Sequence, residues 1–448
     1  MATTYLSKTL STATSDGIIG TFSFWVKFSG VRLDGNDYML LSSYADGNNR
    51  MHIKIDGDNK LDINSRIGGS VHLSKITNRR FRDTSGWYNI IVAIDTSQGT
   101  AANRCKVYVN GTQETSFATS TDPSQNQKIH ALENSKVHYW GSYGGAPTNS
   151  AYALDGLMSH INFIDGTQAA PTIFGSTDST TGEWKISTSP SVTYGNNGYF
   201  ILKDGNSVTD QSGNSNNFTV GNGTLTNTED CPSNVFATID QQYRVNRAQS
   251  VTLSSGNTKV VSSGNNWKNF VSTLTMGSGK YYCEYKVDAW NGSNLQFVGV
   301  VADWMNLNKS SHPDSFAGNA TNGIGYAMNG NYTYNNSDTS GGASYAANDI
   351  IGVALDATNS KLYFSKNGSW QFSGDPSNNS GGISIAANLN YFFVFGHYGS
   401  QGGSFNFGNG FFGTTAISSE GTNASGIGKF EYDVPTGFAA LSTKGLNN

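Results

Sequence analysis

Hydrophobic and polar residues alternate in short runs along the first 170 residues, and turn residues separate these runs. Thr21–Phe28 (TFSFWVKF) alternates aromatic with small or polar residues, the period-two pattern of a half-buried strand. Trp87–Ile94 (WYNIIVAI) is almost continuously apolar, which is typical of a strand buried on both faces. Asp56-Gly57-Asp58-Asn59 separates two strand-like runs and predicts a hairpin turn. The pattern predicts about a dozen short strands before residue 168.

The pattern changes between residues 169 and 240, where Gly, Ser, Thr and Asn dominate and the apolar runs become shorter. Aromatic residues recur too often in this segment for a free linker, so it is predicted to be ordered; they are Phe174, Trp184, Tyr194, Phe200 and Phe218. Strand-like runs resume beyond it and continue to about residue 415.

One hairpin pattern occurs twice. Ile94-Asp95-Thr96 leads into KVYVNG, and Leu355-Asp356-Ala357-Thr358 leads into KLYFSKNG, so each buried strand ends at Asp and each second strand closes on Asn-Gly. No segment has the length, periodicity and caps of an amphipathic helix. We therefore predict an all-β protein with two antiparallel β-sandwich (jelly-roll) domains. They occupy residues 1–168 and 241–415, with an ordered Gly/Ser/Asn-rich connector at 169–240 and a C-terminal tail at 416–448.

The amino-acid composition excludes several classes of protein and of partner. Aromatic residues make up 12% of the 448 residues and the net charge is only −4, which excludes an intrinsically disordered chain. A near-neutral chain attracts phosphate weakly, so no nucleic-acid partner is expected. The three cysteines give no disulfide framework. With no basic-then-apolar leader and no apolar run of membrane length, synthesis in the cytoplasm and no membrane insertion are expected.

Motifs for catalysis, cofactors and metals are weak. Gly408-x-Gly410-x-x-Gly413 matches a dinucleotide-binding string but opens no helix, so its glycines are interpreted as turn residues and no cofactor is expected. Glycoside hydrolysis needs two facing carboxylates, and the nearest candidates are Glu284 and Asp288 on one strand-like run without a third carboxylate. No catalytic residue is therefore assigned.

A calcium site remains an alternative interpretation of the turn described above. Asp56, Asp58 and Asp62 could supply oxygen ligands. A hairpin turn also explains Gly57 and Asn59, so no metal ligand is assigned.

Binding chemistry is better represented. Trp and Tyr in Gly/Asn-rich loops offer flat apolar faces for sugar rings, and neighbouring Asn and Asp can bond to hydroxyl groups. The candidate ligand-binding residues are Tyr44, Asp46, Asn48, Trp140, Tyr143, Trp290, Trp304, Tyr332, Tyr334 and Trp370. Core packing is the alternative for each aromatic residue.

Several strand motifs resemble known families. Residues 20–166 resemble the concanavalin A-like, laminin-G-like jelly roll, on TFSFWVKF, SGWYNI, KVYVNG and FIDG. Residues 250–410 resemble a SPRY domain, on GKYYCEYKV, GIGYAMNG, NDIIGVALD and KLYFSKNG. The connector (FGSTDSTTGEW, DCPSNVFATID) and the tail (YDVPTGFAAL) are similar to segments of structural proteins of tailed bacteriophages, especially marine and cyanobacterial ones.

The resemblance implies a non-enzymatic virion protein: a fibre, adhesin or decoration subunit at the virion surface, with binding at its loop ends. Its implied partners are other virion proteins, further copies of itself and a host-surface glycan. The laminin-G calcium ligands find no clear match in this sequence. Two alternatives stay open, a glycan-degrading enzyme of the concanavalin A-like class and a SPRY adaptor that binds peptides.

Overall fold

The regular secondary structure of the described residues is almost entirely antiparallel β-sheet, which confirms the predicted all-β class. The structure is a computed structural model that describes residues 3–31, 35–203, 207–241, 251–264, 267–290, 292, 296–302 and 316–447. It divides into unit 1, Met1–Asn227 with Cys231–Ser233, and unit 2, Thr228–Asp230 with Asn234–Asn448. Within the described ranges, no helix is both long and apolar enough to cross a bilayer.

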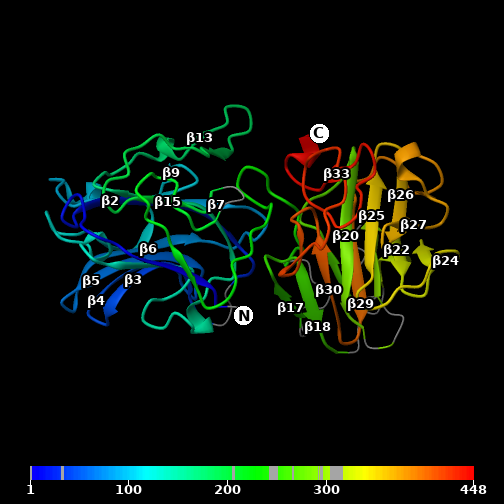
Figure 1. The fold of residues 1–448 in the computed structure, drawn as a ribbon, viewed down its shortest axis with the longest axis horizontal. Helices are drawn as coiled ribbons and strands as arrows, with labels where there is room; N and C mark the ends of the chain where they lie inside the picture. Colours follow the sequence, from blue (N-terminus) through cyan, green and yellow to red (C-terminus); the bar gives the residue numbers. More distant parts are fainter. Residues whose placement is uncertain are drawn as a thin grey trace. The chain divides into compact units, whose positions relative to one another are not determined.

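Unit 1 is a sandwich of two sheets (Figure 1). The eight-stranded sheet has the order β10 (Phe117–Thr121), β6 (Ser70–Arg80), β5 (Lys60–Ile67), β4 (Asn49–Ile55), β3 (Tyr38–Asp46), β11 (Val137–Trp140), β1 (Tyr5–Thr9) and β16 (Thr219–Gly221). The six-stranded sheet has the order β15 (Tyr199–Ile201), β12 (Gly156–Asp165), β2 (Ile19–Phe28), β7 (Tyr88–Asp95), β8 (Cys105–Val109) and β9 (Thr112–Gln113). The hairpin of β13 (Gly175–Thr177) and β14 (Trp184–Ile186) and the 3-10 helices η1 (Ala101–Asn103), η2 (His130–Leu132), η3 (Ser150–Tyr152) and η4 (Pro171–Ile173) complete it.

The six-stranded sheet of unit 1 is buried on both faces. On β7, Ile90 and Val92 belong to the core between the sheets, whereas Ile91 and Ala93 belong to a second apolar cluster on the opposite face. The second cluster also contains Phe174, Tyr194 and Phe200 from the predicted connector. Full burial of each large apolar side chain contributes about 1.5–3 kcal/mol, which explains why residues 169–203 form an ordered layer over this face.

Unit 2 is also built from two main sheets. The larger has the order β17 (Val251–Ser254), β18 (Lys259–Ser262), β30 (Gln401–Asn406), β20 (Lys280–Ala289), β25 (Ile350–Asp356), β26 (Lys361–Lys366) and β27 (Ser369–Trp370), with β28 (Ile383–Ser384) beside β26 and β33 (Ala439–Ala440) beside β20. The smaller has the order β19 (Trp267–Val271), β29 (Phe392–Tyr398), β21 (Gln296–Val301), β22 (Gly323–Ala327), β23 (Tyr332–Tyr334) and β24 (Ser337–Thr339). Short elements are the pair β31 (Phe411–Phe412) and β32 (Thr415–Ala416) and the 3-10 helices η6 (Ala317–Asn319), η7 (Pro376–Asn378) and η8 (Gly445–Asn447).

The repeated Asn-Gly hairpins of the two units use the same bonds. In unit 1, the Asn110 side-chain oxygen accepts the N–H of Asn89 at 2.8 Å, and in unit 2 that of Asn367 accepts the N–H of Ile350 at 2.8 Å. In both turns Asn and Gly have positive φ, as a type I′ hairpin requires. Each Asn therefore closes its own turn and also bonds the first part of the neighbouring buried strand.

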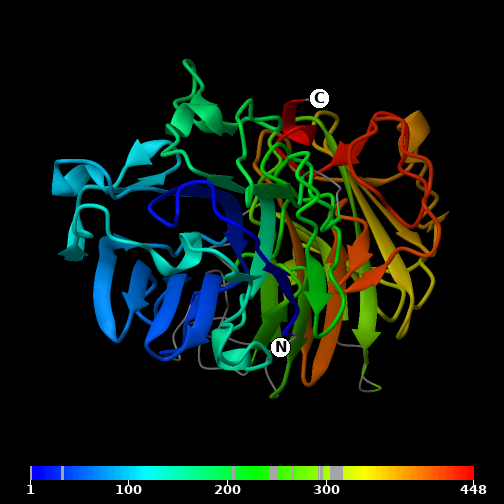
Figure 2. The ribbon, with the colours of Figure 1, turned by 60° about the vertical axis from the view of Figure 1, so that its left-hand side comes forward.

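The C-terminal segment covers the outer face of the larger sheet of unit 2 and appears in red in Figures 1 and 2. Phe430, Phe438 and Ala440 pack on Tyr282 and Ala354, which point away from the core between the sheets. β33 pairs in parallel with β20. The predicted tail is thus an integral layer of unit 2.

A buried carboxylate fixes this segment. Glu284 on β20 accepts the backbone N–H groups of Glu431 at 2.9 Å and Tyr432 at 2.8 Å, together with the side chains of Asn406 and Tyr282. Burial raises its pKa to about 7, although these hydrogen bonds oppose the shift. Asp288, its candidate partner for hydrolysis, is bonded to Ser404 and lies 3.3 Å from the Lys259 ammonium.

Trp140 lies in the core of unit 1 and is 1% exposed, so its assignment as a ligand-binding residue is wrong. Its indole N–H donates to the Tyr199 hydroxyl at 2.9 Å, and the same hydroxyl lies 2.9 Å from Nδ1 of His138. Burial lowers the pKa of His138 to about 4, so its imidazole is neutral at pH 7. Alternation within VHYW explains the placement, because His138 and Trp140 share the inward face of β11 and Tyr139 faces outward.

Replacing Tyr199 with Phe should destabilise unit 1 by about 1–3 kcal/mol, because the buried Trp140 indole and His138 imidazole each lose a partner. Chemical denaturation followed by tryptophan fluorescence measures this change. Tyr108→Phe is the control, since Tyr108 lies partly exposed on β8 outside this network. Equal stabilities of the two variants would contradict the proposed role of the hydroxyl.

Replacing Glu284 with Gln should remove the pH dependence of the stability of the C-terminal segment. The pKa of Glu284 is raised in the folded state, so its contribution to stability is present below its ordinary pKa and is lost as the pH rises through about 7. In the wild type, the opening free energy of residues 430–440, measured by hydrogen exchange and corrected for intrinsic rates, should fall between about pH 5 and about pH 8.

The Glu284→Gln variant should show no such fall. Glu431→Gln is the matched control, because the Glu431 carboxylate accepts a bond from Ser418 and does not contact Glu284, whereas the backbone N–H that donates to Glu284 is kept in this variant. A wild-type opening free energy that is constant across this range would overturn the assignment.

Candidate binding site

The outer face of the eight-stranded sheet carries a row of polar residues. Strand registers place one residue of each strand directly opposite the next, in the order Thr219, Ser7, Tyr139, Ser42, His52, Asn64, Ser74 and Thr121. Directly opposed residues in antiparallel strands point to the same face. Apolar clusters cover the outer faces of the six-stranded sheet of unit 1 and of both main sheets of unit 2. Among the outer faces of the main sheets, this polar face is therefore the candidate binding surface.

Three tyrosines gather at one edge of this face. Tyr44 at the end of β3 lies 5.2 Å from Tyr143, and Tyr143 lies 5.3 Å from Tyr152 in η3, measured between ring centroids. All three are partly exposed. We call them the tyrosine cluster. The structure thus brings together two loops that the sequence had nominated separately, Tyr44–Asn49 and Trp140–Tyr143.

The loop that carries Tyr143 is fixed to the sheet beneath it. The Ser42 hydroxyl donates to the carbonyl of Ser142 at 3.0 Å and accepts the N–H of Gly144 at 2.8 Å. A Cβ atom on Gly144 would lie 2.6 Å from the ring of Tyr139. Only glycine allows the loop to lie this close to the sheet, so the tyrosine cluster is held in place before any ligand arrives.

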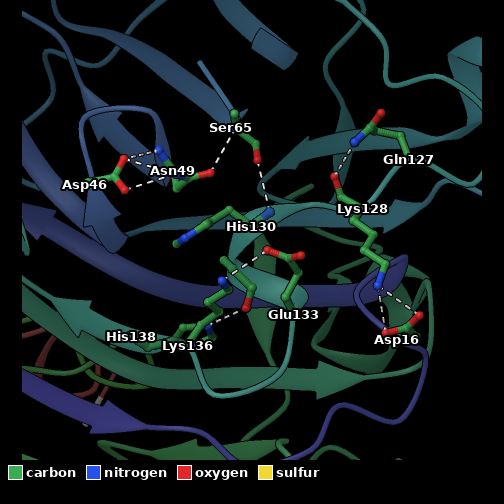
Figure 3. A network of polar contacts seen from close by, with 12 residues as sticks. Asp16, Asp46, Asn49, Ser65, Gln127, Lys128, His130, Glu133, Lys136 and His138 are labelled. Atoms are coloured by element: carbon green, nitrogen blue, oxygen red, sulfur yellow. Dashed lines mark hydrogen bonds and ion pairs between the residues drawn. The ribbon is translucent and has the colours of Figure 1, made fainter. Parts of the chain in front are cut away.

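The turn after Tyr44 is equally constrained. The Asp46 carboxylate accepts the N–H groups of Asn48 at 2.7 Å and Asn49 at 2.9 Å, and it also bonds the Asn49 side chain (Figure 3). These bonds, the Asn49 side-chain bond foremost, lower the pKa of Asp46. Asn49 in turn accepts the N–H of Gly68 at 2.9 Å from the next hairpin. Asp46 therefore serves the turn, while the neighbouring Asn48 side chain is exposed.

The inner side of the same strands is anchored by η2. The N–H of His130 donates to the Ser65 hydroxyl on β5 at 3.2 Å (Figure 3). Burial lowers the pKa of His130 to about 4, so no charge develops beneath the site at neutral pH. Two surface ion pairs, Lys136 with Glu133 and Lys128 with Asp16, flank this helix.

Carboxylates on the outer face are paired with cations. Lys54 lies 2.9 Å from Asp37 and 3.5 Å from Asp62, and His52 lies 3.5 Å from Asp62. Burial alone would raise the pKa of Asp62, but His52 and Lys54 outweigh it and lower the pKa. A general acid for glycoside hydrolysis needs the opposite shift.

The three aspartates of the calcium alternative have separate roles. Asp56 caps the hairpin turn by accepting the N–H groups of Asp58 at 2.9 Å and Lys60 at 2.8 Å. Asp62 faces His52 and Lys54 on the sheet. The structure shows the turn that the sequence pattern predicted, and no group of metal-ligand residues occurs among the described residues.

The predicted aromatic residues of unit 2 lie mainly against its core. Tyr332 and Tyr334 on β23 are partly buried, and the Tyr332 ring meets Phe372 edge-on at 5.0 Å. Trp370 packs beside Tyr282 under the C-terminal segment. Trp290 follows β20 and is 38% exposed, whereas Trp304 lies outside the described residues.

Sequence reasoning did not nominate three residues of the site, Tyr152, Arg50 and Arg66. Arg50 on β4 lies beside Tyr143 and opposes the rise in the pKa of that phenol caused by burial. Arg66 on β5 lies directly opposite Arg50. Period-two alternation in NRMHIKI already places Arg50 with His52 and Lys54 on one face, which was the available signal.

Several solved structures are similar to parts of this chain. Among solved structures, the chain is similar to the SPRY domain of human HERC1, with 17% identity over 37% of this chain and 96% of that chain and a TM-score of 0.28. It is similar to the native heptameric SAP-like pentraxin from Limulus polyphemus, with 15% identity, coverages of 49% and 89% and a TM-score of 0.31. It is also similar to the TRIM65 PSpry domain, with 13% identity, coverages of 38% and 88% and a TM-score of 0.29.

Similarities at these TM-scores do not bear on the function of the chain, and no curated protein sequence matches it. The family comparison is more direct. Residues 3–173 match the model of the concanavalin A-like lectin/glucanases superfamily, of the laminin G type, which confirms the resemblance that residues 20–166 show to this fold.

Proposed function

We propose that the chain is a non-enzymatic, glycan-binding structural protein of a tailed-bacteriophage virion, and that the tyrosine cluster is its sugar-binding site. The observation that carries the binding proposal is the meeting of Tyr44, Tyr143 and Tyr152 on the open polar face of a sandwich. The name of the matched family covers both lectins and glucanases, so binding and hydrolysis have to be weighed separately.

The geometry suits a sugar ring. The three tyrosine rings meet tilted or edge-on and each is partly exposed, so a ring face is not covered by stacking within the cluster and can receive the C–H face of a pyranose. Exposed Asn48 and the polar row supply donors and acceptors for hydroxyl groups. Because Gly144 and the Asp46 turn already fix both loops, little conformational entropy is lost on binding.

Binding without hydrolysis is favoured by the state of the carboxylates. Asp37 and Asp62, on the polar face, are ion-paired, and Glu284 is fully buried under the C-terminal segment. The alternative, a glycan-degrading enzyme, predicts shortening of polysaccharide chains. The purified chain can be incubated with each polysaccharide that it binds, and size-exclusion chromatography then shows whether the polysaccharide becomes shorter. A shorter polysaccharide would indicate hydrolysis, and an unchanged length is the result expected for binding alone.

The virion assignment is supported by the sequence resemblance of the connector and tail to segments of phage structural proteins. In this role the chain would contact other virion proteins and copies of itself at the particle surface. Cryo-electron microscopy and mass spectrometry of particles from the phage that encodes it test this assignment, and its absence from them would refute it. The SPRY adaptor alternative predicts instead a defined peptide partner for unit 2.

Replacing Tyr143 with Ala should weaken glycan binding by at least about tenfold, because the central ring of the cluster is lost. The binding of wild type and variant should be compared on an array of bacterial surface polysaccharides. The affinity for each polysaccharide that the wild type binds should then be measured by calorimetry. Tyr108→Ala is the matched control, since it removes a partly exposed tyrosine from the opposite sheet of the same unit. Equal losses in both variants would contradict the proposed site, and unchanged melting temperatures would exclude unfolding as the cause.

A further inference from the structure

Two arginines lie directly opposite one another beside the tyrosine cluster. The registers pair Tyr44 with Arg50 and Arg50 with Arg66, so the three side chains form one row across β3, β4 and β5. Val71 on β6, which is 39% exposed, lies opposite Arg66 and continues this row. The row therefore presents one tyrosine, two guanidinium groups and an apolar side chain, in that order across the sheet.

Neither arginine has an anionic partner among the described residues. Arg50 donates to the carbonyl of Gly47 at 2.6 Å and lies beside Tyr143, but forms no ion pair with a described residue. The Arg66 guanidinium forms no hydrogen bond or ion pair with the described residues, and its Nε atom is buried. By contrast, Lys54 on β4 and Lys75, Arg79 and Arg80 on β6 each have an acidic partner.

An uncompensated pair of this kind is a cost to the free protein. Like charges directly opposite one another in a sheet are destabilising. An oxyanion between the two guanidinium groups would remove the repulsion, since each presents a planar fork of N–H donors that fits a carboxylate, sulfate or phosphate. The nearest turn contributes one opposing charge, Asp46, whose oxygens already accept bonds from Asn48 and Asn49.

We propose that Arg50 and Arg66 bind the acidic group of an anionic glycan whose sugar ring stacks on the tyrosine cluster. This inference rests on the proposed glycan-binding function and adds the class of ligand. The two arginines would bind an oxyanion attached to a sugar ring, as in uronic acid residues or in sulfate and phosphate esters of sugars. The adjacent Val71 would contact an apolar face of the next residue of the chain.

The test compares three probes with the full chain: an oligogalacturonate, a sulfated galactose oligosaccharide and a neutral galactose oligosaccharide of the same length. The wild type should bind at least one acidic probe about tenfold more tightly than the neutral one, and this preference should shrink as salt is raised. The Arg66→Gln variant should lose the preference and keep the weaker neutral binding. Arg66 is the better position to change, because Arg50 also holds the turn at Gly47.

Two control variants separate the effect of losing a positive charge from the effect of changing this particular site. Arg79→Gln removes the same charge from the same sheet at a residue already paired with Glu114, and it should retain the preference. Arg66→Lys keeps the charge without the fork and should give an intermediate preference. Without ligand, Arg66→Gln should melt at a higher temperature than the wild type, because the repulsion is relieved; a lower melting temperature would overturn the claim that the pair is uncompensated.

The outcomes distinguish this inference from the function on which it rests. Equal binding of acidic and neutral probes, abolished by Tyr143→Ala but unchanged by Arg66→Gln, would overturn the role of the arginines and leave the sugar site intact. Failure of the wild type to bind any probe, and any polysaccharide of the array, would refute the glycan-binding function itself.

Discussion

Sheets that carry apolar side chains on both faces are the constraint on which the rest of this structure depends. Besides the core between the sheets, β7 of unit 1 directs Ile91 to the outer face, and the larger sheet of unit 2 directs Tyr282 and Tyr363 to its outer face. An exposed outer face of this kind would leave several large apolar side chains in water, each at a cost of about 1.5–3 kcal/mol. Both units solve the problem with chain that is poor in regular structure, residues 169–203 in one and the C-terminal segment in the other.

This covering also determines where a ligand can bind. Apolar clusters cover the outer faces of three of the four main sheets, and the outer face of the remaining one, the eight-stranded sheet, is crossed by a polar row from Thr219 to Thr121. The loops at the edge of that face are held by side-chain bonds to the backbone, notably from Ser42 and Asp46. The result is a rigid platform whose free edge carries the aromatic residues, an arrangement that favours binding with little reorganisation.

Much of the fold could be predicted because it depends on local patterns. The strand TFSFWVKF, the apolar run WYNIIVAI and the two Asn-Gly hairpins all appear in the structure. The alternation in TFSFWVKF predicted a half-buried strand, however, and the strand is buried on both faces because residues 169–203 cover the outer face of its sheet. The candidate site was predicted only in pieces, since Tyr44 lies at the end of β3 and Tyr143 in the loop after β11, and the pairing of these two strands is specified by no local pattern. Trp140 was misassigned because aromatic type was given more weight than its position in an alternating strand. Arg50 and Arg66 were overlooked because their opposition exists only once β4 and β5 are paired.

In this protein, the surroundings of an ionisable group distinguish a structural role from the proposed binding role. Glu284 is fully buried, and four donors surround it, so its carboxylate completes the packing of the C-terminal segment. Arg50 and Arg66 lie at a rim where carboxylates could have been placed at little cost, yet the described residues supply none for ion pairing. The Glu284 carboxyl group is fully hydrogen-bonded inside the fold, whereas two opposed guanidinium groups without a described carboxylate partner beside a fixed aromatic cluster are explained by an anion that comes from outside the chain.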